Sequence, residues 1–152
     1  MRRGKKIIKP VYSFAPSKQK GIVFLLHGSG GTAANFVGSF ENYEMITDRV
    51  SKDFAVIVTE SEESTLGDLD GNGKIQWQVS PADSVNNVDY ANIKIITDTF
   101  YNRHVINRSV PRYSIGMSNG GNFSSYLSAY YNYKCGICYC AQTSPIFIST
   151  SV

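Results

Sequence analysis

The sequence predicts an α/β protein, a three-layer α/β/α sandwich around a mainly parallel sheet. Short apolar runs of strand length alternate along the chain with segments of helical periodicity, which is the pattern of such folds. Two of the runs, residues 22–26 and 54–58, contain no polar side chain at all. Parallel strands that are buried on both faces typically have such sequences. These two runs therefore predict the centre of the sheet.

Three further segments are expected to form strands. Residues 11–15 end before Pro16 and are expected to form an outer strand. Residues 113–115 and 135–140 supply two more strands. The last of these contains Cys135, Cys138 and Cys140, which we interpret as small apolar side chains of a buried strand. We expect no metal there, since both histidines of the chain are distant in sequence.

The segments between these runs predict helices. Residues 41–52 are expected to form a short helix, and residues 123–130 have apolar side chains on one helical face. Residues 80–83, Ser-Pro-Ala-Asp, have the form of a capped helix start. Apolar residues then recur near the 3.6 period and predict one long helix, namely Val85, Val88, Ile93, Ile96 and Phe100.

Length and charge limit the classes of protein to be considered. We expect residues 1–152 to form a single domain, because we find no repeat and no linker. Residues 1–20 hold seven Lys or Arg and no acid, which leaves the remainder with a net charge of −4. A basic head on an acidic body argues against a nucleic-acid-binding surface. No signal-peptide core and no membrane span is visible, so the default expectation is a cytoplasmic protein.

Residues 61–80 form an acidic, Gly-rich excursion within this domain. Its stretch Asp68-Leu-Asp70-Gly-Asn72-Gly73 resembles the first half of a calcium loop, with oxygen ligands at alternate positions. The twelfth position, where a bidentate Glu is needed, is Val79. We therefore favour a turn-forming excursion and leave weaker calcium binding open.

The first chemically informative motif is a glycine-rich turn, His27-Gly-Ser-Gly-Gly-Thr32, which directly follows the buried run at residues 22–26. Gly28, Gly30 and Ala33 fit the pattern of a dinucleotide-binding turn. The same turn can form an oxyanion loop, in which a backbone N–H points at a developing alkoxide. The acid expected about 20 residues on for a ribose falls near Asp48, inside an expected helix, which weakens the nucleotide interpretation.

The second motif, Gly116-Met-Ser118-Asn-Gly120-Gly121, decides between them. It places G-x-S-x-G between a short strand and an amphipathic helix, which is the context of a nucleophile elbow. The residues two before and two after the serine must be small in such a turn. Ser118 is therefore the candidate nucleophile, and the amide of Asn119 at the helix N-terminus is a candidate oxyanion donor.

Residues 24–31 and 116–121 together resemble the α/β-hydrolase superfamily, and in particular its polyhydroxybutyrate-depolymerase-like and feruloyl- or acetylxylan-esterase-like branch. Asn87-Val-Asp-Tyr90 and Arg112 also fit that branch, and the resemblance spans about residues 11–141. It implies a serine ester hydrolase without a cofactor, with Ser118 as nucleophile. The backbone amides of Ser29 and Asn119 would form the oxyanion hole.

One departure from the family pattern is large. The triad of this fold runs Ser, then Asp or Glu, then His along the chain, yet no Asp, Glu or His follows Ser118. Family order also makes His27 and His104 poor candidates for the base. We therefore interpret the chain as the N-terminal portion of an esterase, truncated before its last strands and inactive by itself.

Two alternatives remain: a non-catalytic nucleotide-binding module that uses the turn from Gly28 to Ala33, and a degenerate hydrolase relative. The esterase interpretation implies a small-molecule or polymer ester as substrate. If the last strands are missing, residues 135–141 form an uncovered edge that promotes self-association.

Overall fold

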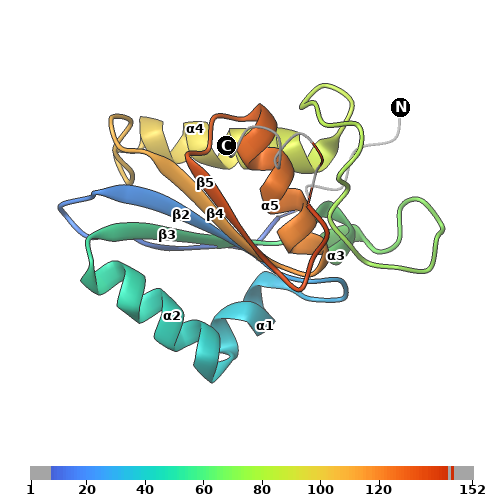
Figure 1. Cartoon of the computed structure of the whole chain (residues 1–152), viewed down its shortest axis with the longest axis horizontal. Coiled ribbons are helices and arrows are strands. Elements are labelled where there is room, and N and C mark those ends of the chain that lie inside the picture. Colours follow the sequence, from blue (N-terminus) through green and yellow to red (C-terminus); the bar gives the residue numbers. More distant parts are fainter. Residues whose placement is uncertain (1–7, 144, 146–152) are drawn as a thin grey trace.

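The fold is a twisted five-stranded sheet between two layers of helices (Figure 1). The computed structural model describes residues 8–143 and residue 145. The strands are β1 (Val11–Phe14), β2 (Gly21–Leu26), β3 (Phe54–Thr59), β4 (Arg112–Met117) and β5 (Cys135–Tyr139). The helices are α1 (Ala33–Gly38), α2 (Phe40–Ser51), α3 (Glu62–Leu66), α4 (Val88–Asn102) and α5 (Asn119–Tyr130). The predicted fold class is therefore confirmed.

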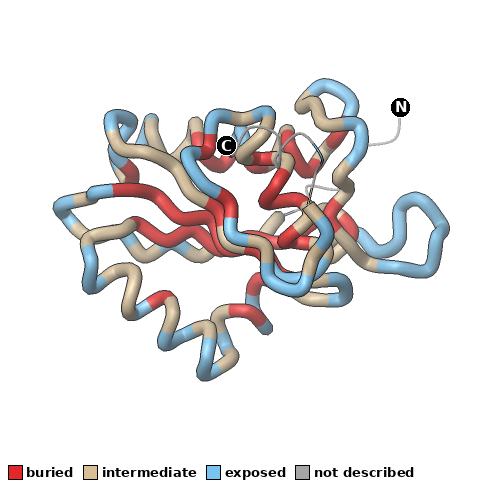
Figure 2. The backbone as a smooth tube through the Cα atoms, viewed as in Figure 1, coloured by how far each residue is buried: buried red, intermediate tan, exposed pale blue. Residues whose placement is uncertain are grey.

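The strand order is β1-β3-β2-β4-β5, with β1 antiparallel and the other four strands parallel. Every residue of β2 is buried, as expected for an apolar strand at the centre of a parallel sheet (Figure 2). In β2, alternate side chains enter the two halves of the core. Val23 and Leu25 pack toward α1 and α2, and Phe24 and Leu26 pack on the side of α4 and α5.

The helix predicted to start at residue 80 begins later, at Val88. The Asp83 carboxylate accepts the N–H groups of Val85 and Asn86 and closes a turn instead of capping a helix. Asn87 takes the N-cap position and accepts the N–H of Asp89. Val85 consequently lies outside the helix and is 90% exposed, so its assignment to the apolar face was wrong.

The interpretation of the three cysteines as buried side chains was also wrong. Cys135 and Cys140 are exposed and Cys138 is half-buried, because β5 is an edge strand of the described sheet. Ile137 and Tyr139 on the same strand are also largely exposed. Within the described residues, no helix has both the length and the apolar character that crossing a bilayer requires.

Candidate active site

The two glycine-rich motifs meet at the carboxyl end of the sheet. Because β2 and β4 are parallel neighbours, with Leu26 opposite Gly116, the turn after β2 and the elbow after β4 emerge side by side. A side chain at Gly28 would place its Cβ 3.4 Å from the Cβ of Ser118 and 3.3 Å from the carbonyl oxygen of Met117. The backbone of the turn therefore lies in van der Waals contact with the elbow.

The elbow itself is a strained backbone turn. Ser118 has φ 52° and ψ −121°, a conformation that only glycine adopts without strain. The side chain of Ser118 is exposed, and its N–H donates to the carbonyl of Tyr139 at 2.7 Å. The strain therefore holds the hydroxyl at the surface, where a ligand can reach it.

The glycines around Ser118 allow this turn to pack. A Cβ on Gly116 would overlap the carbonyl oxygen of Gly120, and a Cβ on Gly120 would overlap that of His27. A Cβ on Gly121 would lie 2.7 Å from that of Ala141. The small residues predicted on both sides of the serine are thus required by backbone contacts.

The two predicted oxyanion donors are backbone amides, one in the turn after β2 and one at the elbow. Among the described residues, none accepts a hydrogen bond from the N–H of Ser29 or of Asn119. Asn119 is the first residue of α5, where the helix leaves its N–H groups unpaired and its dipole favours negative charge. In the turn, Gly30 has φ 74°, and its N–H donates to the carbonyl of Ile75 at 2.7 Å.

His27 has a structural role in the same turn. Its Nε2 accepts the N–H of Ser61 at 3.1 Å, so the proton lies on Nδ1, which donates to the carbonyl of Gly28 at 2.7 Å. Burial lowers the pKa of the imidazole and keeps it neutral. Because both ring nitrogens are engaged, His27 has no nitrogen free to accept a proton from Ser118.

Comparison with solved structures identifies the fold. The acetyl xylan esterase from Aspergillus awamori superposes with a TM-score of 0.65 at 19% identity, over 90% of this chain and 48% of that one. A carboxylesterase from Bacillus cereus superposes with a TM-score of 0.60 at 15% identity, over 91% of this chain and 62% of that one. A poly(3-hydroxybutyrate) depolymerase from Bordetella parapertussis superposes with a TM-score of 0.61 at 10% identity, over 90% of this chain and 47% of that one. The chain has an α/β-hydrolase-like fold.

The chain spans only about half the length of the acetyl xylan esterase and of the depolymerase. At identities of 10 to 19%, the likeness is one of fold. No protein-family model matches the sequence, and a search of curated proteins gives no match.

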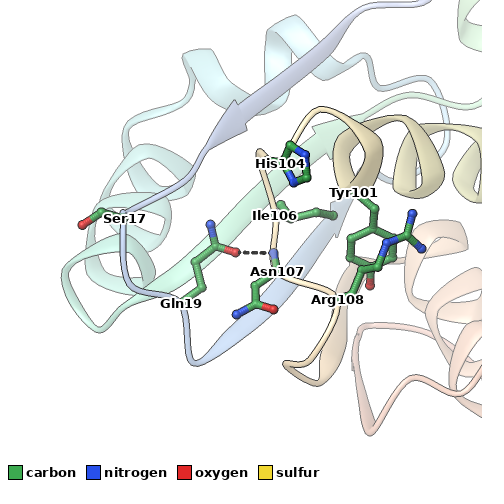
Figure 3. Close-up of a pocket in the computed structure, with 7 residues that line it drawn as sticks. All are labelled: Ser17, Gln19, Tyr101, His104, Ile106, Asn107 and Arg108. Atoms are coloured by element: carbon green, nitrogen blue, oxygen red, sulfur yellow. Dashed lines mark hydrogen bonds between the residues drawn. The ribbon is translucent and has the colours of Figure 1, made fainter.

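The second histidine of the chain, His104, lies at the opposite end of the sheet from Ser118. It lines a cavity of about 430 Å³ formed by the segments that precede β2 and β4 (Figure 3). In Figure 3 the Gln19 side chain accepts a hydrogen bond from the N–H of Asn107. The Arg108 guanidinium lies over the Tyr101 ring in a separate contact. Strands of six residues, about 20 Å long, separate this cavity from the elbow. Neither histidine is therefore placed to act on Ser118.

Several amides of the nucleotide-binding pattern in the turn already have acceptors within the protein. The N–H of Ala33, at the start of α1, donates to the Glu60 carboxylate at 3.0 Å. The N–H of Gly31 donates to the carbonyl of Gly28. A pyrophosphate at this helix start would meet a carboxylate in place of free amides, which is electrostatically unfavourable.

In the acidic excursion, carboxylate oxygens of Glu63, Asp68 and Asp70 lie within 4.8 Å of one another. Some of these oxygens already accept hydrogen bonds from the backbone of the excursion: Asp68 accepts the N–H groups of Gly71 and Gly73 at 2.8 Å. Backbone donation also lowers the pKa of the Asp68 carboxyl. These contacts are those of a local turn, and the same excursion also contains the helix α3, which was not expected from the sequence.

Sequence reasoning assigned no role in the site to three residues that hold it together. The Trp77 N–H donates to Oδ1 of Asn119 at 2.6 Å, and the Asn119 amide donates back to the Trp77 carbonyl at 3.0 Å. Glu63 and Asp89 are buried and accept the N–H groups on either side of Trp77. The available signal was the single tryptophan of the chain, which is out of place in a polar excursion.

Proposed function

We propose that this chain is the serine-bearing part of a carboxylic ester hydrolase that works through an acyl-serine intermediate. The observation that carries the proposal is the backbone of Ser118, an exposed non-glycine residue at φ 52° and ψ −121° between a strand and a helix. Strain of this kind persists where it serves a function, and here it exposes a hydroxyl between two motifs whose Ser29 and Asn119 amides have no acceptor among the described residues. The named esterases among the structural neighbours support the same reaction class.

In the proposed reaction, Ser118 Oγ attacks the ester carbonyl carbon and a base takes the hydroxyl proton. The negative charge on the carbonyl oxygen is stabilised by the N–H groups of Ser29 and Asn119, as an oxyanion hole. The C–O bond to the alcohol then breaks, and the alcohol leaves with the proton from the base. Water attacks the acyl-serine in the same way and releases the acid.

The base and its acid partner are proposed to lie outside these 152 residues, in polypeptide that completes the hydrolase domain. Both histidines of the sequence are accounted for, His27 by its two hydrogen bonds and His104 by its place at the far end of the sheet. Without the base, only the binding and oxyanion contributions remain, so this chain alone is expected to hydrolyse short aryl esters negligibly.

Fluorophosphonate labelling tests the proposal. A longer form that carries the missing base is expected to take up one fluorophosphonate per molecule, at Ser118. Peptide mass spectrometry locates the adduct, and Ser118→Ala serves as the control that must abolish it. The proposal fails if that longer form is not labelled or carries the adduct on another residue.

The alternative of nucleotide binding at Gly28, Gly30 and Ala33 predicts a different result on this chain. NAD or ATP would raise its Tm by mass action if either bound the turn. We expect no shift, because the N–H groups of Gly30 and Ala33 already have acceptors. The alternative of a degenerate relative predicts that no longer form with a base exists, which the reading frame after residue 152 decides.

A further inference from the structure

Residues 75–79, hereafter the 75–79 segment, belong to neither a helix nor a strand, yet side chains from three helices bind their backbone. Three consecutive N–H groups donate to three different side chains. The Gln76 N–H donates to Glu63 of α3 at 2.9 Å, and the Gln78 N–H donates to Asp89 of α4 at 2.8 Å. Between them, the Trp77 N–H donates to Asn119 of α5. The segment is thus held by side chains of three helices instead of by strand pairing.

The same segment binds both halves of the candidate active site. On the side of the turn, the Ile75 carbonyl accepts the Gly30 N–H, and Trp77 Nε1 donates to the His27 carbonyl at 3.0 Å. On the side of the elbow, the Asn119 side chain forms two hydrogen bonds with the Trp77 backbone. Ser29 lies between His27 and Gly30, so its amide is fixed from both sides. The 75–79 segment therefore links the two proposed oxyanion donors.

Asp89 is the side chain that anchors this segment to the rest of the fold. It is fully buried, and its two oxygens accept the N–H of Gln78 and the N–H of Glu62, at 2.8 and 2.7 Å. It thereby joins the 75–79 segment to the first turn of α3. Burying a carboxyl group is costly, and burial raises the pKa of Asp89 to about 6 even though two N–H groups donate to it. A surface loop could leave the same two N–H groups to water without that cost.

We propose that Asp89 is a positioning residue for ester hydrolysis: through the 75–79 segment it sets the distance between the N–H groups of Ser29 and Asn119. Asp89 touches neither amide and no reacting atom, so it acts only through the contacts described above. An oxyanion hole depends on donors that are fixed before the substrate arrives, which gives such an anchor a function. The inference rests on the proposed function, because it assigns those two amides their role.

The test compares Asp89→Asn with Asp98→Asn, a matched control on the same helix whose exposed carboxylate pairs with Lys94. In Asp89→Asn, the amide side chain replaces one acceptor oxygen by a donor, so one of the two N–H groups loses its partner. We expect amide hydrogen exchange at Gln78 or Glu62 to become about tenfold faster. We also expect the amide NMR signals of Ser29 and Asn119 to shift, and all these signals to be unchanged in Asp98→Asn.

The single tryptophan provides a second readout. Trp77 is buried and stacks on Phe123 with ring centroids 4.9 Å apart, so its fluorescence reports directly on the segment. In Asp89→Asn we expect a red shift and stronger acrylamide quenching. If the signals of Ser29 and Asn119 do not move, Asp89 does not position them and the proposal is overturned, whether or not the fluorescence changes.

A second variant keeps the proposal testable if Asp89→Asn does not fold. Trp77→Phe keeps an aromatic ring on Phe123 but removes the Nε1–H donor to the His27 carbonyl. The amide signal of Ser29 is then expected to shift while that of Asn119 stays in place. If the Ser29 signal does not move, the linkage is contradicted. None of these measurements depends on hydrolysis. If an esterase assay fails, the measured effect of Asp89 on the two amides still stands, so the positioning role and the proposed function can be refuted separately.

Discussion

The buried carboxyl of Asp89 predicts how the stability of the protein depends on pH. Burial raises its pKa from 3.8 to about 6, so the folded protein holds this proton over a pH range in which the unfolded chain has released it. Stability then falls as pH rises from about 4 to about 6 and levels off above, because the folded state binds more protons than the unfolded state in that range. A difference of about two pKa units corresponds to about 3 kcal/mol.

Asp89→Asn removes this titration while it keeps the size of the side chain. The quantity to measure is the free energy of unfolding of the wild type minus that of Asp89→Asn, from denaturant titrations between pH 4 and pH 7. We expect this difference to fall by about 3 kcal/mol across the range, and the difference in Tm to fall by roughly 6–12 °C. Asp98→Asn, at an exposed carboxylate, should give no such fall. A difference that stays constant or rises with pH would falsify the reasoning, since the two donated hydrogen bonds would then outweigh burial.

Four further predictions concern the elbow, the excursion and the sheet edge. Ser118→Gly is expected to raise the free energy of unfolding by about 1 kcal/mol, because relief of backbone strain exceeds the entropy cost of glycine. In the same denaturant titration, Ser118→Ala should show no gain in stability. Gly116→Ala is expected to lower the free energy of unfolding by about 3 kcal/mol or to prevent folding, because the added Cβ overlaps backbone atoms. Gly38→Ala, where the added Cβ meets open space, should be tolerated. Equal melting temperatures of the two variants would contradict this prediction. Millimolar calcium should leave the Tm unchanged if residues 68–73 are a turn, and a rise with calcium but not with magnesium would show a binding site. Ile137→Lys should reduce self-association in sedimentation velocity, and unchanged association would exclude the β5 edge as its cause.

The sequence was sufficient for the features that depend on neighbouring residues. Fully apolar runs predicted the two central strands, and the spacing of Gly116, Ser118 and Gly120 predicted a turn that the structure shows to be strained. The start of α4 could not be predicted in this way. Asp83 has the form of a helix cap, but it binds the N–H groups of a different local turn, and propensity does not distinguish the two uses of the same carboxylate.

The features that were missed depend on residues distant in sequence. Trp77 and Asn119 are 42 positions apart, so their mutual hydrogen bonds have no local pattern. The exposure of Cys135 depends on whether another strand pairs with β5, which the composition of β5 does not reveal. Burial and pairing of this kind are properties of the assembled sheet.

The hydrogen bond from the Ser118 N–H to the Tyr139 carbonyl bears on how the protein folds during synthesis. The turn at His27 and the segment with Trp77 leave the ribosome well before the elbow, but the elbow acquires this backbone partner only when residue 139 has also emerged. During translation the strained serine is therefore among the last parts of the described sheet to become fixed. A nascent chain stopped between residues 118 and 139 would carry the whole motif but lack this hydrogen bond.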